Sequence, residues 1–291
     1  MGKPVCVVCD SASTKYWRTV NDYPLWKCKK CELLFAHPLP TDQELDEFYN
    51  KNYHSAGAGY AGFGYQDYEE RNYNWTPARV AYYEKFEKKL LQYVTKEAKL
   101  LDLGCATGAF LIFLRERGWQ KLSGIEYSKD AVTTARKYDL DVLDGKIDDA
   151  PYPDECFDVV YSHFVIEHVK DPHSFMKAVH RVLKPGGYFI CGTDDFGCLR
   201  TKLINFRANF GGAIFNEIKP PEHVLMYSKK TLSTLVERHG FKTLEAVDPR
   251  GVTVNDISVN NFFLHAATSL LKPILKNIPF DNEFLVVAKK S

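Results

Sequence analysis

The sequence lacks a hydrophobic run long enough to span a bilayer. Its longest apolar stretch, residues 262–271, is interrupted by His265 and other polar residues, whereas a membrane-spanning helix needs about 20 apolar residues. The first residues contain no apolar segment of signal-peptide length, and Cys6 stands where a myristoylation motif requires Ser or Thr. We therefore expect a cytoplasmic protein without a transmembrane segment.

The chain also lacks an excess of charge of either sign. Lys and Arg number 38 and Asp and Glu number 37, which gives a net charge of +1. Because attraction to nucleic acid or to an anionic membrane grows with positive charge, the composition favours neither partner, although a local basic patch remains compatible with it. The 291 residues are sufficient for one sizeable domain with an attachment, or for two modest domains.

Cysteine is abundant, and four of the eight cysteines lie close to the N-terminus. Without an export signal, free thiols or metal ligands are favoured over disulfides. Cys6 and Cys9 form one Cys-x-x-Cys pair, and Cys28 and Cys31 form a second pair farther along the chain. Two such turns supply the four thiolates of a closed, tetrahedral and therefore structural zinc site. We predict a zinc ribbon over residues 1–40, with buried or redox-active cysteines as the alternative.

Residues 41–76 differ in character from the ribbon. Between Tyr53 and Tyr65, four glycines alternate with aromatic residues. Glycine at this density does not hold a regular element, yet so many aromatic side chains are poor material for an exposed linker. Two interpretations remain open: a lid that closes over a ligand, or an interdomain strap whose aromatic side chains pack on the core.

From residue 77 to residue 291 the chain alternates between helical and strand patterns. Such alternation predicts a doubly wound α/β domain with a parallel sheet, whose ligands bind beyond the carboxyl ends of the strands. Two insertions interrupt the pattern, at about residues 196–222 and 251–281. Strands are expected near residues 99–103, 121–126, 157–162, 188–193, 241–247 and 283–289.

The first strand-to-helix turn carries the most informative motif. Residues 101–108, Leu-Asp-Leu-Gly-Cys-Ala-Thr-Gly, resemble the first motif of the class I S-adenosylmethionine-dependent methyltransferases, approximately Asp-x-Gly-x-Gly-x-Gly. Asp102, Gly104 and Gly108 match this pattern, and Ala106 replaces the middle glycine with one additional methyl group. A nicotinamide-binding turn would need Gly-x-Gly-x-x-Gly to cradle a pyrophosphate, and that spacing does not occur here.

The resemblance implies a Rossmann-like, seven-stranded doubly wound sheet and S-adenosylmethionine as cofactor. Glu126 ends the second expected strand, where a carboxylate can accept hydrogen bonds from both ribose hydroxyls. In the family pattern the next residue lies along the adenine, and a carboxylate of the following loop meets the adenine amino group. The residues expected to contact the cofactor are Asp102, Gly104, Cys105, Ala106, Gly108, Glu126, Tyr127, Ile147, Asp148, Ser162 and His163.

Two later motifs extend the resemblance over about residues 77–195. Residues 167–172, Glu-His-Val-Lys-Asp-Pro, are similar to a stretch common in small-molecule methyltransferases, and residues 183–187, Leu-Lys-Pro-Gly-Gly, are expected to form a chain-reversing turn. The ribbon followed by Phe-x-x-Pro-x-Pro-Thr at residues 35–41 resembles a bacterial subgroup found in sugar, polysaccharide and secondary-metabolite pathways.

The chemistry expected from this resemblance is methyl transfer to a small-molecule acceptor, favouring O-methylation of a sugar or secondary-metabolite hydroxyl. A hydroxyl acceptor must lose its proton, so a His or a carboxylate is needed at the rim of the pocket. His223 and His168 are the candidate catalytic bases, and Asp194 and Asp195 are the alternatives. With an ordinary imidazole as base, the rate should rise with pH through about 6 to 7.

Other functions remain open at this stage. An RNA base methyltransferase could use the ribbon to bind RNA, although residues 1–40 hold only six Lys or Arg against three acidic residues. The chain also lacks the Asn/Asp-Pro-Pro-Tyr/Phe turn typical of enzymes that methylate exocyclic base nitrogens. A sugar C-methyltransferase and a non-enzymatic zinc-dependent interaction module are the remaining alternatives. The oligomeric state and the acceptor atom stay undetermined.

Overall fold

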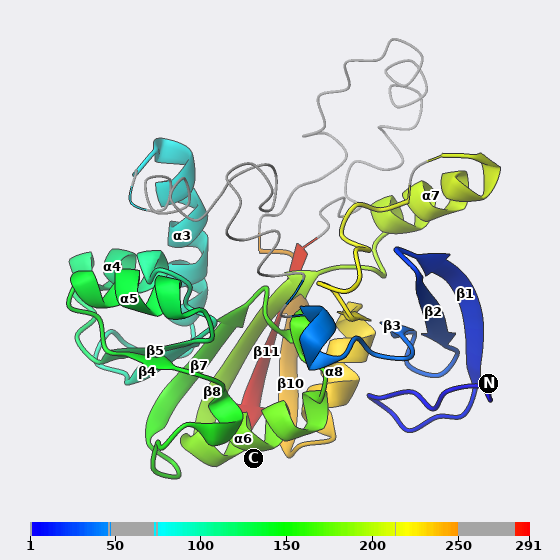
Figure 1. The fold of residues 1–291 in the computed structure, drawn as a ribbon. Helices are drawn as coiled ribbons and strands as arrows, with labels where there is room; N and C mark the ends of the chain where they lie inside the picture. The colour runs from blue at the N-terminus through cyan, green and yellow to red at the C-terminus, as the bar shows by residue number, and fades with distance from the viewer. Residues whose placement is uncertain (1, 46, 48–72, 74, 213, 250–282) are drawn as a thin grey trace, which may run out of the picture.

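The computed structural model describes residues 2–45, 47, 73, 75–212, 214–249 and 283–291. Its strands form two sheets, one of seven strands between layers of helices and a smaller one of four strands at the N-terminal end (Figure 1). The glycine-aromatic segment between Tyr53 and Tyr65, for which both a lid and an interdomain strap were considered, lies outside the described residues, as does the expected insertion at residues 251–281. The predicted α/β class is confirmed.

The large sheet has the strand order β10-β11-β8-β7-β4-β5-β6. Five strands run parallel: β4 (Leu100–Leu103), β5 (Leu122–Glu126), β6 (Val142–Asp144), β7 (Phe157–His163) and β8 (Leu183–Asp194). At the other end, β11 (Glu283–Lys290) pairs antiparallel with both β8 and β10 (Phe241–Val247). The parallel pairing expected from the sequence is therefore wrong for β11, because an apolar strand pattern reports burial and not strand direction.

Helices cover both faces of this sheet (Figure 1). One face carries α3 (Pro77–Leu90), α4 (Ala109–Glu116) and α5 (Lys129–Lys137), and the other carries α6 (Pro172–Val182) and α8 (Lys229–Glu237). Four of them begin at a side chain that accepts a hydrogen bond from the first turn, as helix N-termini require. These capping residues are Thr76, Ser128, Asp171 and Ser228.

The Leu-Lys-Pro-Gly-Gly sequence does not form the chain-reversing turn expected of it. It lies inside β8, where the pairing with β7 shifts register between the pairs Phe157–Leu183 and Val159–Tyr188. Gly186 has a φ of +75° at this irregularity, a conformation that glycine adopts without strain. The two glycines thus allow an irregularity in a continuous strand.

The small sheet joins the N-terminal residues to the core. Its strands are β1 (Thr14–Val20), β2 (Tyr23–Cys28), β3 (Leu34–Ala36) and β9 (Leu225–Met226), in that order and all antiparallel. β9 comes from the segment just before α8, far from β3 in the sequence. All four ribbon cysteines belong to the same apolar cluster as the side chains of α6 and α8. The ribbon is therefore packed into the core rather than tethered beside it.

The chain that follows β8 forms α7 (Leu199–Arg207) and the short helix η4 (Ala208–Phe210). In Figure 1 this segment extends above the small sheet, and the guanidinium of Arg18 on β1 donates to Asn209 Oδ1 at 2.9 Å. Phe206 and Phe210 are 62% and 78% exposed. Within the described ranges, no helix combines the length and the apolar character needed to cross a membrane.

Candidate active site and candidate zinc centre

The four N-terminal cysteines lie together in a buried cluster. The Sγ atoms of Cys6 and Cys31 are 3.5 Å apart, and those of Cys9 and Cys28 are 3.6 Å apart. All four ligand atoms lie within 4.8 Å of one another. A hydrogen bond from the Cys31 thiol lowers the pKa of Cys6, which favours a thiolate there. Four buried sulfur donors at this separation fit a tetrahedral Zn²⁺ ion with no place left for water.

The turn after β4 has the backbone that its glycine pattern requires. Gly104 and Gly108 have φ values of +73° and +85°, and Ala106, at the position where glycine is usual, has a φ of +50°. A Cβ on Gly104 would lie 2.3 Å from Cγ2 of Val165, and a Cβ on Gly108 would lie 2.1 Å from Cδ1 of Leu140. The two glycines are thus fixed both by conformation and by close packing.

Glu126, at the end of β5, is held in place by backbone amides. Its Oε2 accepts from the Ala106 N–H at 2.9 Å, and its Oε1 accepts from the Ser128 N–H at 2.8 Å. Burial raises the pKa of this carboxyl, and these amides act in the opposite direction. Each carboxylate oxygen has a further lone pair, so Glu126 can accept ribose hydroxyls while the amides keep it oriented. The neighbouring Tyr127 is 61% exposed, with Lys146 Nζ 5.1 Å from its ring centroid.

Asp102 lies on β4, between β5 and β7, and is only 4% exposed. Burial, and secondarily the charge of Glu126, raise its pKa well above the ordinary value. The buried carboxyl group of Asp102 and the half-buried one of Glu126 favour a cation beside the turn, which fits the sulfonium and ammonium charges of S-adenosylmethionine. In the following loop, Ile147 is buried and Asp148 is exposed on η2 (Ile147–Asp149).

Three other predicted cofactor residues lie farther back in the packing. Cys105 is buried, and its Sγ would lie 2.6 Å from a Cβ at Gly124, so its side chain fills space behind the turn. Ser162 is fully buried, and its Oγ has no hydrogen-bond partner among the described residues. His163 Nε2 lies 2.9 Å from Oε1 of Glu283 on β11, a partner that the sequence motifs do not indicate.

The two candidate bases come together, although they are far apart in the sequence. His168 lies on η3 (Ile166–His168), which follows β7, and His223 precedes β9. Their rings are 4.8 Å apart in an edge-to-face arrangement. Burial lowers the pKa of His168 to about 4 and that of His223 to about 2. Both imidazoles are therefore neutral near pH 7, and the expected rise in rate through pH 6 to 7 does not follow from them.

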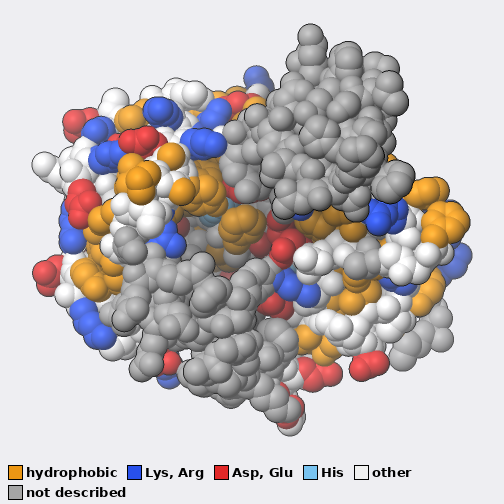
Figure 2. Space-filling model, turned by 90° about the horizontal axis from the view of Figure 1, so that it is seen from above, with side chains coloured by type: hydrophobic (Ala, Val, Ile, Leu, Met, Phe, Trp, Pro, Cys, Tyr) orange, Lys and Arg blue, Asp and Glu red, His pale blue; other side chains and the backbone are white. Residues whose placement is uncertain are grey.

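Carboxyl groups surround this histidine pair. Glu167 is 1% exposed, and its Oε2 accepts from the Thr193 hydroxyl at 2.8 Å. Asp194 and Glu217 each place an oxygen within 4.8 Å of a His223 nitrogen. Seen from above, the face that carries the carboxyl ends of the parallel strands shows acidic side chains near its middle, beside hydrophobic patches (Figure 2). Sequence motifs missed Glu217 because it lies in an insertion without recognisable spacing. The other alternative base, Asp195, is buried, and its Oδ1 accepts from the Gly197 N–H.

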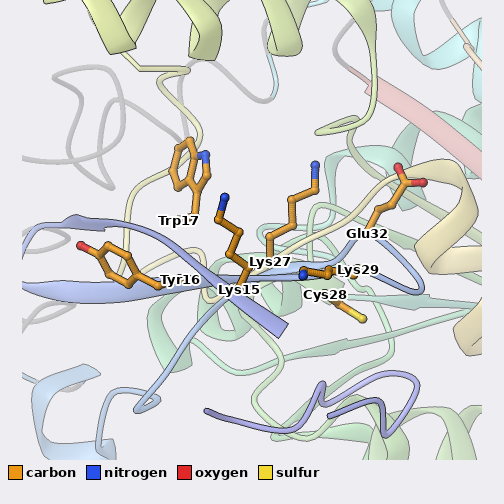
Figure 3. Close-up of a pocket in the computed structure, with 7 residues that line it drawn as sticks. All are labelled: Lys15, Tyr16, Trp17, Lys27, Cys28, Lys29 and Glu32. Carbon is orange, nitrogen blue, oxygen red and sulfur yellow. The ribbon is translucent and has the colours of Figure 1, made fainter. Parts of the chain in front are cut away.

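A hollow lies on the ribbon itself, away from the glycine turn and the histidine pair. It has a volume of about 420 Å³ and is lined by Lys15, Tyr16, Trp17, Lys27, Cys28, Lys29 and Glu32. In Figure 3, Lys15, Trp17 and Lys27 project to one side of the strands, whereas the sulfur of Cys28 points to the other. The sulfur of Cys28 and the side chains of Lys15 and Lys27 thus lie on opposite faces of the ribbon (Figure 3).

Comparison with known proteins agrees with this geometry. A family model described as a methyltransferase domain matches residues 76–246. An uncharacterised methyltransferase from Schizosaccharomyces pombe is 29% identical over 151 residues, which cover 47% of this chain and 52% of that protein. A demethylmenaquinone methyltransferase from Bacillus licheniformis is 28% identical over 136 residues, or 44% and 57% of the two chains. The chain thus spans somewhat more than half the length of these curated relatives.

Among solved structures, a SAM-dependent methyltransferase from Archaeoglobus fulgidus superposes with a TM-score of 0.52 at 18% identity. The superposition covers 78% of this chain and 99% of that one. At this level of identity the likeness establishes the fold alone. It agrees with the seven-stranded α/β sheet described above.

Proposed function

Because the chain belongs to the methyltransferase domain family, we propose that it transfers the methyl group of S-adenosylmethionine to a small-molecule acceptor, most directly to a hydroxyl. The observation that carries the proposal is the Glu126 carboxylate, oriented by the Ala106 and Ser128 amides beside a turn of positive-φ residues. This arrangement supplies the acceptors for a ribose and the open backbone against which a nucleoside can lie.

The acceptor side of the site is proposed to lie at His168 and His223. Val165, just before η3, contacts Gly104 in the glycine turn, since a Cβ at Gly104 would lie 2.3 Å from its Cγ2. The loop that carries His168 therefore borders the turn that carries the cofactor residues. The carboxyl ends of β4 and β7 are adjacent, which is where ligands bind in doubly wound sheets.

The proposed roles of the residues follow from the reaction. Bound S-adenosylmethionine supplies a methyl group on a sulfonium that is already a good leaving group. The chain must then align the acceptor oxygen with the methyl carbon and exclude water. As the oxygen–carbon bond forms, the hydroxyl proton must leave, and a neutral imidazole can take it. We propose that His223 accepts this proton, with His168 as the second candidate. The Nδ1–H of His223 donates to the Glu217 carbonyl oxygen at 2.8 Å, which fixes the orientation of the ring.

The proposal that the acceptor is a sugar or a secondary metabolite is supported by the sequence resemblance alone. Structural zinc is proposed to bind Cys6, Cys9, Cys28 and Cys31, where the sulfur spacing supports it. Because some of the relatives are named demethylmenaquinone methyltransferases, the acceptor screen also includes quinones. Because lysines line the hollow on the ribbon and could bind phosphates, RNA is included as an acceptor in the same screen.

Incubation with methyl-labelled S-adenosylmethionine tests the proposal. The acceptors to compare are sugar nucleotides, phenolic and quinone metabolites, and RNA transcripts. We expect an O-methyl product from a small molecule, identified by the carbon chemical shift of the transferred methyl. A product methylated at carbon or at an RNA base would contradict the hydroxyl assignment, and absence of cofactor binding would contradict the function as a whole.

A further inference from the structure

A second group of metal-binding side chains lies away from the cysteines, in the core. Glu167, His168 and His223 each place one ligand atom within 4.8 Å of the others. Glu167 and His223 are 1% and 3% exposed, and His168 is partly buried. Two histidines and one carboxylate are a common ligand set for divalent transition metals. Imidazole nitrogens bind these metals in preference to Mg²⁺ and Ca²⁺.

The tautomers of the two histidines suit coordination. His168 Nδ1 is 2.9 Å from the Glu222 carbonyl oxygen, and His223 Nδ1 is 2.8 Å from the Glu217 carbonyl oxygen. Since a carbonyl can only accept, each Nδ1 carries the hydrogen, and each Nε2 has the lone pair. A backbone carbonyl that fixes Nδ1 in this way is a common outer contact of metal-ligating histidine.

The carboxyl group of Glu167 supplies an independent indication of a ligand. Its Oε2 accepts from Thr193, but Oε1 is buried and has no hydrogen-bond partner among the described residues. A buried polar atom without a partner is costly, and native structures hold few of them. A bound cation beside Oε1 would satisfy this atom.

The charge around the cluster also favours a cation. Asp194 and Glu217 both lie within 4.8 Å of a His223 nitrogen. Facing them from the segment before β9 is Lys219, whose Nζ is 3.1 Å from Glu217 Oε2 and 3.5 Å from Glu222 Oε2. Among the described residues, the carboxyl groups of Glu167, Asp194, Glu217 and Glu222 thus outnumber this one lysine near the histidine pair.

We propose that Glu167, His168 and His223 form a second divalent-cation site, separate from the cysteine cluster, and that Zn²⁺ bound there inhibits methyl transfer. The inhibitory part rests on the proposed function: an imidazole whose lone pair is bound to a metal ion cannot accept a proton from the acceptor hydroxyl. The binding part rests only on the cluster itself.

Metal stoichiometry tests the binding part on the full chain with its cysteine site loaded. After equilibration with Zn²⁺ and gel filtration, we expect two zinc ions per chain. Replacement by Co²⁺ separates the sites, because four thiolates give an intense sulfur-to-metal charge-transfer band and the nitrogen and oxygen ligands do not. Glu167→Gln and His168→Ala should each weaken binding of the second ion by more than the roughly 10- to 100-fold that loss of an outer contact costs, and they should leave the thiolate band unchanged.

A matched control uses the other histidine pair of the molecule. His173 Nδ1 and His239 Nε2 are 2.7 Å apart near the surface, so His239→Ala removes a histidine pair outside the cluster and should keep both metal ions. One zinc ion per chain in the native protein would overturn the site. A second ion that persists in both Glu167→Gln and His168→Ala, or disappears in His239→Ala, would overturn it as well.

Methyl transfer assayed against added Zn²⁺ tests the inhibitory part. We expect transfer to fall as the second equivalent binds and to recover when a brief chelator treatment removes that equivalent alone. Binding of the second ion without loss of transfer would overturn the inhibition and leave the metal site standing. Transfer that is intact while no second ion binds would overturn the site and leave the proposed function standing.

Discussion

At the residue scale, Glu126 has two tasks that a substitution should separate. Its carboxylate orients the glycine turn through the Ala106 amide, and it offers acceptors to a ribose. We expect Glu126→Ala to weaken S-adenosylmethionine binding by roughly 1–3 kcal/mol, because hydroxyl donors would lose their partners. Titration calorimetry measures this. Glu126→Gln keeps one oxygen acceptor and should lose less, so equal and unchanged affinities in two folded variants would remove Glu126 from the site.

The candidate base also makes a prediction at this scale. His223→Ala should lower turnover about 10²–10⁴-fold, since general-base catalysis acts on the chemical step. Cofactor affinity should stay near that of the native chain, because Glu126 and the glycine turn are untouched. Single-turnover rates and calorimetry separate the two quantities. Should transfer proceed at the native rate, the proton must pass to His168, Asp194 or Asp195 instead.

Burial of His168 predicts a pH dependence of stability. Its pKa is about 4 in the folded protein and 6.5 as a free side chain. Between these values the unfolded chain binds more protons, so the contribution of His168 to the free energy of unfolding falls by about 3 kcal/mol as pH decreases from 6.5 towards 4, and His223, whose pKa is lowered further, adds to the fall. Urea unfolding at several pH values measures this slope. His168→Asn should make this slope less steep without removing it, because His223 remains, whereas His239→Asn, outside the cluster, should change the slope less.

At the element scale, the turn between β4 and α4 depends on glycine packing. Gly108 has a φ of +85° and leaves no room for a Cβ beside Leu140, whereas Gly118 has a φ of +95° with no heavy atom within 4 Å of its Cβ position. Gly108→Ala should therefore lower the free energy of unfolding by about 2–4 kcal/mol, and Gly118→Ala by about 1 kcal/mol. Chemical denaturation of both variants gives the comparison. Similar losses would indicate that conformation, not packing, requires glycine at position 108.

The elements predicted best from the sequence are those with local signals. The turn at residues 102–108 and the acid at the end of β5 follow from spacing in the sequence. The antiparallel direction of β11 and the irregularity inside β8 have no such signal. Both depend on which strands become neighbours, which is decided by packing far along the chain.

At the scale of the whole molecule, the features of the site that the sequence did not predict also depend on contacts between distant segments of the chain. Motifs placed His168 and His223 separately, but their contact depends on β9, a very short strand that pairs with β3 of the ribbon. Pairing over so short a length leaves no pattern in the sequence. The unpartnered Oε1 of Glu167 and the His163–Glu283 pair are likewise visible only in three dimensions.

The ribbon supports the acceptor side of the site through a continuous chain of contacts. The Ala36 N–H of β3 donates to the Val224 carbonyl at 3.0 Å, and the Val224 N–H donates to the Glu167 carbonyl at 3.0 Å. His223 is thus fixed between the ribbon and η3. The cofactor turn is anchored elsewhere, because the Gly104 N–H donates to the Ile125 carbonyl of β5 at 2.8 Å.

Loss of the proposed zinc site should therefore affect methyl transfer more than cofactor binding. We expect Cys28→Ser to lower the melting temperature and to reduce turnover at least tenfold, because β3 no longer holds β9 and His223 in place. S-adenosylmethionine affinity should change less than threefold, because the glycine turn and Glu126 are anchored on β5 and not on the ribbon. Cys156→Ser, a partly buried cysteine outside the cluster, is the control. Parallel loss of affinity and turnover in Cys28→Ser would mean that zinc stabilises the whole fold uniformly; native turnover without zinc would show that the ribbon does not position His223.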